Sequence, residues 1–442
     1  MLFHSALPLL LLCFRISQQL NRKLFFQPGG GLTKRTLESF FGLLLILICG
    51  TAAAQTELRP LQFGMSTALS GPAAELGVNM RDGLLIAFDR SNRTGGIRGR
   101  ELRLRVLDDA YEPKQTVQNL KQLVVDPRIL AIVGNVGTPT AIAALPIIRQ
   151  HQILFFAPFT GAGALRRSPP ERYVINFRAS YAEETAAMVD ALIEVGGLEP
   201  QQIAFFTQRD GYGDAGFYGG IEALRRHGLE NELEVQHVRY ERNTLAVENA
   251  LADLLYSESL PKAIIIVGAY TPVAKFIRLA RDSDVDALML NVSFVGSQPL
   301  FDALKEPAGN ILVTQVVPHH NNKGLPVVAE YLEDVVQYDR SLKPSFGSLE
   351  GYLAGRVLIR ALSSLQEDPD RINLIDALES LGRFDVGLNY QLELSPEEHQ
   401  ASHRVWPTVL TEQGVSHFEW TDIGRLLGGN SSDNSNNSGS RE

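Results

Sequence analysis

Cysteine is nearly absent from this sequence of 442 residues. Its two cysteines, Cys13 and Cys49, both lie within the first 54 residues, which we expect to be removed on export. The remaining chain then has no thiol, which excludes disulfides, thiolate metal ligands and a cysteine nucleophile. An exported domain needs no disulfide when its core is large, and residues 55–442 provide chain for two or three domain-sized cores.

Long hydrophobic runs are also scarce near the N-terminus. The run Phe40 to Cys49 is too short for a membrane-spanning helix, which needs about 20 residues. It follows Lys34 and Arg35 and precedes small residues that end at Ala54, an order typical of a cleaved signal peptide. We therefore expect residues 1–54 to be a leader, whose first 33 residues reflect a start site set too far upstream, and we expect a periplasmic protein.

Positive charge is in deficit. Without the leader, 36 Lys and Arg residues face 49 Asp and Glu residues, a net charge of −13. Binding to nucleic acid depends on clustered positive charge, so we exclude nucleic acid as a partner. The last residues, 425–442, are polar and of low complexity, which is typical of a disordered tail.

Catalytic motifs are missing as well. The sequence has no G-x-S-x-G elbow and no P-loop. His319 and His320 are adjacent, so in a strand they would point to opposite faces, which suits a solvated pair better than a shared metal. Asp108 and Asp109 are typical of residues that cap the next helix, which is predicted to begin at Pro113. We expect no enzyme activity, no catalytic residue, no cofactor and no metal.

A glycine-rich turn, "FTGAGALR", follows the apolar run "ILFFAP". Gly161 and Gly163 match the start of a dinucleotide fingerprint, but Arg166 stands at the third glycine position. The turn therefore favours a backbone cradle for a smaller group.

Strand-like and helix-like segments alternate through the rest of the chain. "ELRLRV" alternates strictly, while "ILAIVG" and "ILFFAP" are apolar throughout, as expected of strands buried on both faces, and "QIAFFTQ" and "AIIIVGA" are further strand-like runs. Each run precedes a segment of helical period. This alternation predicts an α/β fold with doubly wound parallel sheets, and its length predicts two lobes.

An internal echo supports two lobes. "IVGNVGTPTA" begins at Ile132 and "IVGAYTPVA" at Ile266. In each, a threonine (Thr138, Thr271) is predicted to cap a helix whose first residue is the following proline. Two helix N-termini at the carboxyl ends of parallel strands favour an anion such as a carboxylate.

Six motifs, in this order, resemble the leucine/isoleucine/valine-binding protein family, the type I periplasmic solute-binding proteins of ABC importers. They are "TALSGPAAELG", "GGIRGRELRLRVLDDAYEPKQTV", "IVGNVGTPTA", "ILFFAPFTGAGAL", "RDGYGDAG" and "GAYTP". The resemblance covers residues from about Leu61 to Trp420. It implies two lobes with a three-crossover hinge, near 177–180, 315–319 and 384–388. The lobes would comprise 55–178 plus 316–385, and 179–315 plus 386–424.

The resemblance also implies a ligand site between the lobes. By motif position, the hydroxyl of Thr138 and the turn Phe159, Thr160 and Gly161 would bind a ligand carboxylate. Leu76 would form part of the wall of the site. From the second lobe, Tyr212 and Tyr270 would close over the ligand, and a tyrosine at such a turn offers both an apolar ring and a hydroxyl.

Three features depart from the family pattern, and one of them is the threonine of the carboxylate turn, which appears one place early as Thr160. Ser293 stands where amino-acid binders commonly have a glutamate for the α-ammonium group, and a hydroxyl cannot balance a buried charge. Either Asp210 or Glu350 supplies that charge, or the ligand has no ammonium group. The small family disulfide is absent too, with Tyr111 at one of its positions.

The sequence therefore predicts a monomeric periplasmic substrate-binding protein of an ABC importer. Its ligand would be a small amphipathic solute, either a branched-chain or other amino acid or a related amide or carboxylate. Its partners would be this ligand and a permease in the inner membrane. The alternative is a ligand-sensing module that reports to a membrane receptor or kinase, because one fold serves both uses.

Overall fold

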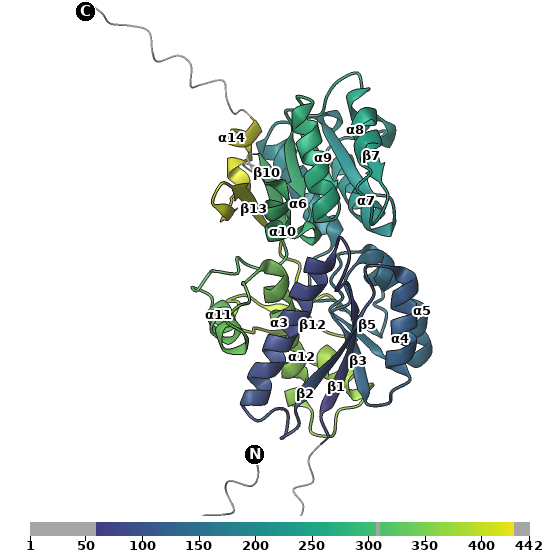
Figure 1. The fold of residues 1–442 in the computed structure, drawn as a ribbon, viewed down its shortest axis with the longest axis vertical. Helices are drawn as coiled ribbons and strands as arrows, with labels where there is room; N and C mark the ends of the chain where they lie inside the picture. Colours follow the sequence, from purple (N-terminus) through teal and green to yellow (C-terminus); the bar gives the residue numbers. More distant parts are fainter. Residues whose placement is uncertain (1–58, 306–309, 428–442) are drawn as a thin grey trace, which may run out of the picture. The chain divides into compact units, whose positions relative to one another are not determined.

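The computed structural model describes residues 59–305 and 310–427, which belong to one compact unit with two main sheets (Figure 1). The expected leader, residues 1–54, and residues 428–442 of the expected tail lie outside the described residues. Among the described helices, none is both long and apolar enough to cross a membrane.

The first lobe is built on five parallel strands in the order β2-β1-β3-β4-β5. These are β1 Leu61–Thr67, β2 Leu102–Asp108, β3 Ile129–Val133, β4 Leu154–Phe156 and β5 Val174–Ile175. Its helices are α3 Ala74–Arg93, α4 Pro113–Val124, α5 Thr138–His151, α11 Pro326–Tyr338, α12 Phe346–Ser364 and α13 Asn373–Glu379. Strands β3 and β4 are buried at every position, which explains why their sequences are apolar throughout.

Helices α3 and α12 lie against each other, and small residues allow this close approach. A Cβ atom on Gly83 of α3 would lie 2.0 Å from the carbonyl oxygen of Ser348 in α12. The contact therefore tolerates no side chain at Gly83, and it holds the N-terminal part of α12 beside the middle of α3.

The second lobe has seven strands in the order β14-β13-β10-β9-β8-β6-β7. The five parallel ones are β6 Ile203–Gln208, β7 His237–Tyr240, β8 Ala263–Val267, β9 Leu288–Asn291 and β10 Ile311–Gln315. At one edge β13 Trp406–Thr411 and β14 Gly414–His417 are antiparallel, a feature that the sequence prediction of parallel sheets did not include. The helices are α6 Tyr181–Asp190, α7 Gly211–Arg226, α8 Glu248–Leu255, α9 Tyr270–Asp282, α10 Ser297–Leu304 and α14 Ile423–Leu427.

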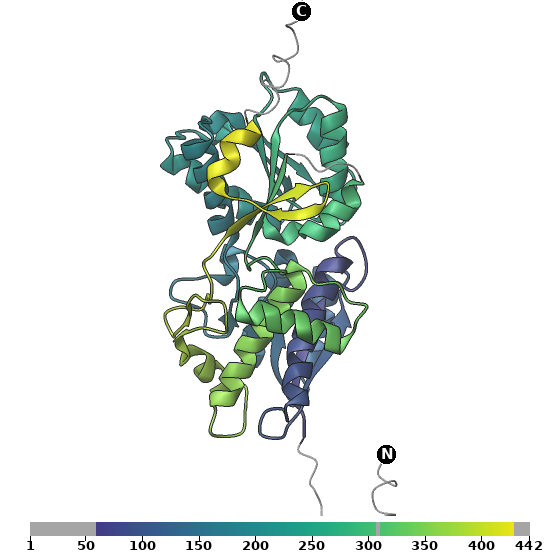
Figure 2. The ribbon, with the colours of Figure 1, turned by 90° about the vertical axis from the view of Figure 1, so that its left-hand side faces the viewer.

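The chain passes between the two sheets three times, and Figure 2 shows the C-terminal strands in the second lobe. The passages lie between β5 and α6, after β10, and between β12 (Leu392–Leu394) and β13. The last lies later than the expected segment 384–388. The cause is a hairpin in which β12 pairs with β11 (Gly382–Phe384), after which Gln400 still forms a β-bridge with Asn176. A second correction concerns the tail, since residues 425–427 belong to α14.

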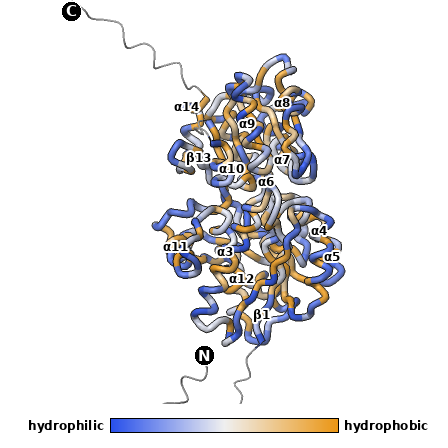
Figure 3. Tube along the Cα trace, in the orientation of Figure 1, coloured by the Kyte–Doolittle hydropathy of each residue, from blue (hydrophilic) through white to orange (hydrophobic). Residues whose placement is uncertain are grey.

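Apolar residues follow the strands and the inward faces of the helices, while the outer loops are mostly hydrophilic (Figure 3). One buried cluster includes residues of both lobes, among them Phe159 and Phe294. Further clusters lie within the second lobe and within the first. Burial therefore continues from one lobe to the other.

Candidate functional site

A cavity of about 20 Å³ lies between the lobes, enough for about one water molecule. Its walls come from α3, α12 and the turn after β4 in the first lobe, and from the turn after β9 and the start of α10 in the second. The residues used below are Leu76, Asn79, Phe159, Arg178, Ser293, Phe346, Gly347 and Glu350. Contact across the lobes is tight, since a Cβ atom on Gly296 would lie 2.8 Å from Cδ2 of Leu76.

Arg178 is the central charged residue of this cavity, and it is only 1% exposed. Its Nε lies 3.0 Å from Oε1 of Glu350, and its Nη2 donates to Oε2 at 3.1 Å, which makes a side-on ion pair. Nη2 also donates to Oγ of Ser293 at 2.9 Å. The guanidinium lies 4.3 Å from the ring centre of Phe159. Among the described residues, neither Nε nor Nη1 has a hydrogen-bond partner, and Nε contacts Glu350 only as an ion pair.

Two buried carboxylates surround this arginine. Burial raises the pKa of Glu350 to about 7, although the guanidinium of Arg178 opposes the shift. Burial also raises the pKa of Glu184, on α6, against the opposing effect of Arg178. Glu184 accepts hydrogen bonds from the backbone N–H of Ser293 at 2.6 Å, from its hydroxyl at 2.9 Å, and from Thr314. Ser293 therefore links Arg178 to Glu184.

Because Ser293 replaces a glutamate, another carboxylate would have to bind an ammonium group, and the structure shows in part which ones are available. Of the two carboxylates suggested for an ammonium group, only Glu350 lines the cavity, and Arg178 already occupies both of its oxygens. Asp210 instead caps α7 by accepting from the backbone N–H of Tyr212 at 2.9 Å. Glu184, which the sequence analysis did not single out, is the carboxylate nearest to Ser293.

The predicted carboxylate turn is compact. The hydroxyls of Thr138 and Thr160 are hydrogen-bonded at 2.6 Å. A Cβ atom on Gly161 would lie 2.5 Å from the backbone nitrogen of Tyr181, so this position fits only glycine. Thr138 was expected to cap α5, but it is the first helical residue, Gly137 is the cap, and no side-chain cap bond forms. Of this turn, Phe159 lines the cavity.

An aromatic cluster packs beside this turn, with Phe294 of the second lobe at its centre. Its ring centre lies 5.7 Å from that of Phe159, 6.0 Å from that of Tyr111 and 4.7 Å from that of Tyr212. Tyr212 also packs against Tyr181 at 5.1 Å and donates to the carbonyl oxygen of Gly268 at 3.3 Å. Phe294 lies in the turn after β9, Tyr212 at the start of α7 and Tyr181 in α6. The other two rings, Tyr111 and Phe159, belong to the first lobe.

Of the remaining predicted residues, Leu76 lines the cavity and Tyr270 does not. Leu76 is 3% exposed. Tyr270 is half-buried and is the first residue of α9, so Thr271 was wrongly expected to precede that helix as its cap. Phe159, Ser293 and Leu76 thus share one cavity, while Tyr212 belongs to the aromatic cluster.

Two further sequence expectations need correction. The rings of His319 and His320 do not point apart but stack 4.8 Å from each other, because the chain turns there instead of continuing as a strand. Both rings pack against Phe346. Asp108 and Asp109 do not cap α4. Asp108 accepts from the hydroxyl of Ser70 in the loop after β1, and Asp109 accepts from the hydroxyls of Ser66 in β1 and Thr116 in α4, whereas the cap position of α4 is Glu112.

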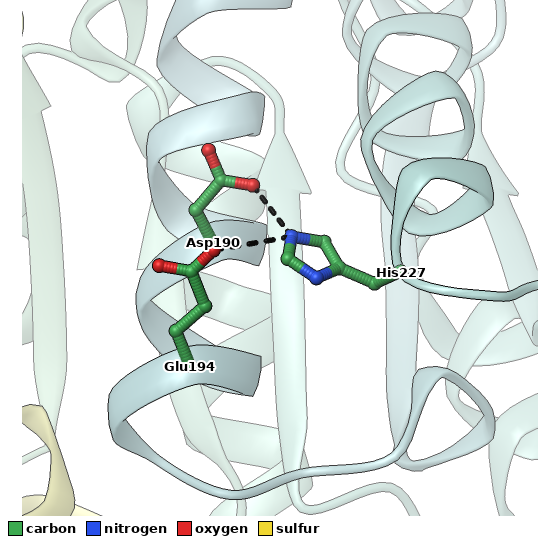
Figure 4. A group of neighbouring side chains, drawn as sticks. All are labelled: Asp190, Glu194 and His227. Atoms are coloured by element: carbon green, nitrogen blue, oxygen red, sulfur yellow. Dashed lines mark hydrogen bonds and ion pairs between the residues drawn. The ribbon is translucent and has the colours of Figure 1, made fainter.

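One group outside the cleft brings together possible metal ligands. Asp190 and Glu194 extend toward His227, with ligand atoms within 4.8 Å of one another (Figure 4). His227 lies 2.8 Å from Asp190, and the Nη2 atom of Arg226 lies 3.6 Å from the same carboxylate. The arginine already supplies positive charge there, so we interpret the group as a contact between α6 and α7.

Comparisons with known proteins agree with this fold. A protein-family model described as "Periplasmic binding protein" matches residues 60–414. The solved structure of a possible leucine/isoleucine/valine-binding protein from Rhodopirellula baltica SH 1 is 49% identical, with a TM-score of 0.81. That match covers 84% of this chain and 99% of the other.

Two curated relatives match over shorter regions. A Leu/Ile/Val-binding protein from Rhizobium johnstonii is 28% identical over 39% of this chain and 46% of its own length. A Leu/Ile/Val-binding protein homologue from Brucella melitensis is 24% identical over 54% of this chain and 62% of its own length. This chain therefore matches less than two thirds of the length of either relative.

Proposed function

The chain belongs to the periplasmic binding protein family, in its leucine/isoleucine/valine-binding group, and from this premise we propose that it is the substrate-binding protein of an ABC importer. It binds a small amphipathic solute between its lobes and passes it to a permease in the inner membrane. It is exported by a signal peptide, acts as a monomer and catalyses no reaction.

The observation that carries this proposal is the shared lining of the cavity. Leu76 and Phe159 come from the first lobe and Ser293 from the second, with Arg178 on the passage between them. A ligand that contacts both lobes binds the closed arrangement better than the open one, so its binding drives hinge closure. The cavity is small, so entry of a solute requires the lobes to separate first.

The other predicted ligand contacts are proposed around this cavity. Thr160 and Gly161 follow Phe159 in the turn after β4. The hydroxyl of Thr138 at the start of α5 is hydrogen-bonded to that of Thr160, and Tyr212 packs in the same aromatic cluster as Phe159. We propose that these residues, together with Tyr270 at the start of α9, surround the ligand when the lobes reclose on it.

Thermal unfolding against a ligand panel tests the proposal. The panel contains branched and aromatic amino acids, the corresponding acids without the amino group, and short amides. A true ligand at 100 times its dissociation constant stabilises the protein by about 2.7 kcal/mol. Leu76→Ala should weaken this ligand-dependent shift, while Leu233→Ala, at a position 87% exposed, should leave it unchanged. A panel without any shift would contradict the proposal.

Transport needs a separate measurement. Deleting the gene should abolish uptake of the solute that stabilises the protein, and restoring it should restore uptake. Uptake that continues unchanged would contradict the importer role while leaving solute binding intact.

A further inference from the structure

We propose that the cleft selects a small carboxylic acid that has an apolar tail and no ammonium group, and that its carboxylate binds Nη1 of Arg178 and the N-terminal turn of α12. This inference rests on the proposed function and specifies its ligand. It places the acidic group beside the hinge, on Arg178 and α12, and not in the turn Thr160–Gly161 that the family resemblance implies.

The first argument is the unpartnered side of Arg178. Nη2 donates to Glu350 and to Ser293, while Nε contacts Glu350 as an ion pair at 3.0 Å and has no hydrogen-bond partner among the described residues. Nη1 is buried and has no acceptor among the described residues, although its side chain lines the cavity. A buried charged donor without an acceptor is costly, so the site favours a ligand that supplies one. A carboxylate matches the guanidinium geometry best.

The second argument is the helix end that faces the same cavity. Helix α12 has 19 residues and begins at Phe346, and both Phe346 and Gly347 line the cavity. The hydroxyl of the cap residue, Ser345, accepts from the backbone N–H of Ser348 at 3.1 Å. The N–H groups of the first helical residues have no partner within the helix, and the helix dipole favours an anion beside them.

The third argument concerns the ammonium group of an amino acid. The oxygens of Glu350 already accept from Arg178, and Glu184 is satisfied by Ser293 and Thr314. An ammonium group in the cavity would lie near the buried guanidinium of Arg178 without a free carboxylate to bind it. Like charges in a buried site repel strongly, so a zwitterion is disfavoured.

The remaining walls define the tail of the ligand. Leu76, Phe159 and Phe346 are apolar, and Val316 and Val317 complete this side. They suit an aliphatic or aryl chain, which accounts for the amphipathic character expected of the solute. The ligand class is therefore a monocarboxylate with a short apolar tail.

Calorimetric titration of the purified protein with matched probes tests the inference. The probes are 4-methylpentanoate, leucine and 4-methylpentanamide, which share one carbon skeleton, and the pair 3-phenylpropanoate and phenylalanine. We expect one of the two acids to bind at least tenfold more tightly than its amino acid, and the amide to bind more weakly than the acid.

Substitutions of Arg178 test whether the acid binds to this residue. Arg178→Gln leaves Glu350 unpaired and risks misfolding, so the main test is the double variant Arg178→Gln/Glu350→Gln, which removes both charges. It should lose acid binding by at least tenfold. Arg103→Gln, at an exposed arginine, is the matched control and should bind the acid like the natural protein.

The outcomes separate the inference from the proposed function. Binding of leucine or phenylalanine in preference to its acid overturns the inference and leaves the proposed function intact. Acid binding that the double variant retains overturns the assignment to Arg178. Failure of every probe in both series counts against the inference and the proposed function together.

Discussion

The guanidinium of Arg178 and the carboxylate of Glu350 form a buried ion pair, with Nε and Oε1 3.0 Å apart. The two residues are 172 positions apart in the chain, one on the first passage between the sheets and the other on α12. Each is at most 2% exposed. The pair therefore joins the hinge to the first lobe at the wall of the ligand cavity.

Removing one partner of this pair should destabilise the protein far more than removing both. Arg178→Met leaves a carboxylate buried without its partner, which costs about 3–5 kcal/mol. The double variant Arg178→Met/Glu350→Leu replaces both charges with apolar groups and should restore most of that loss. Urea unfolding at pH 8, above the pKa of Glu350 in the natural protein, measures both effects. Equal losses in the single and double variants would show that the pair is not coupled.

The stability of the protein should depend on pH through Glu350. Its pKa is about 7 in the fold, against an ordinary value of 4.5, because the side chain is buried. The folded state therefore holds this proton more tightly than the unfolded state. The resulting stability is fully present below pH 4.5 and is lost as the pH rises through 7, by roughly 3 kcal/mol.

Because other groups also titrate, the test compares two proteins. The difference in unfolding free energy between natural protein and Glu350→Gln should change between pH 4.5 and pH 8, in favour of the variant at high pH. A constant difference would show that Glu350 has an ordinary pKa.

The sequence was sufficient for the alternating fold because its strand signals are local. Runs such as Ile129–Val133 are apolar at every position, and only strands covered on both faces need that pattern. The antiparallel edge was missed because β13 and β14 lack such continuous runs. Their signal is a short turn that ends at Gly414, whose φ of 112° suits glycine, between two strand-like segments.

The site was only partly predictable because its charges meet across long distances in the chain. Motif order led to Phe159, Ser293 and Leu76, which share the cavity. Arg178 was regarded only as part of a crossover, since nothing local shows that Ser293 and Glu350 will enclose it. The usable signal was an arginine directly after a buried strand, in "VINFRAS", where a charge needs partners.

The glycine-rich turn offers a matched pair of substitutions. Gly161→Ala places a Cβ atom 2.5 Å from the backbone nitrogen of Tyr181, whereas a Cβ atom on Gly163 has nothing within 4 Å. Overpacking against backbone should cost Gly161→Ala about 1–3 kcal/mol, and Gly163→Ala should stay within about 0.5 kcal/mol of the natural protein. Thermal unfolding measures both, and equal midpoints would contradict the tight contact with Tyr181.

Ligand affinity should also follow the protonation of Glu350. The charged side chains around it are Arg178, Glu184 from α6, and Arg166 from the turn after β4. An anionic ligand on Arg178 adds a negative charge beside this carboxylate, so its proton is bound more tightly in the complex. Binding of 4-methylpentanoate should therefore strengthen as the pH falls from 8 to 6, by up to about tenfold per pH unit.

Calorimetry in buffers of different ionisation enthalpy should then detect proton uptake with the ligand above pH 7. Glu350→Gln should abolish both the uptake and the pH dependence, while the exposed-site variant Glu393→Gln should keep them. An ammonium ligand would show the opposite trend, because it binds best when Glu350 is ionised. The sign of the pH dependence thus decides which charge the ligand carries, independently of which compound is found first.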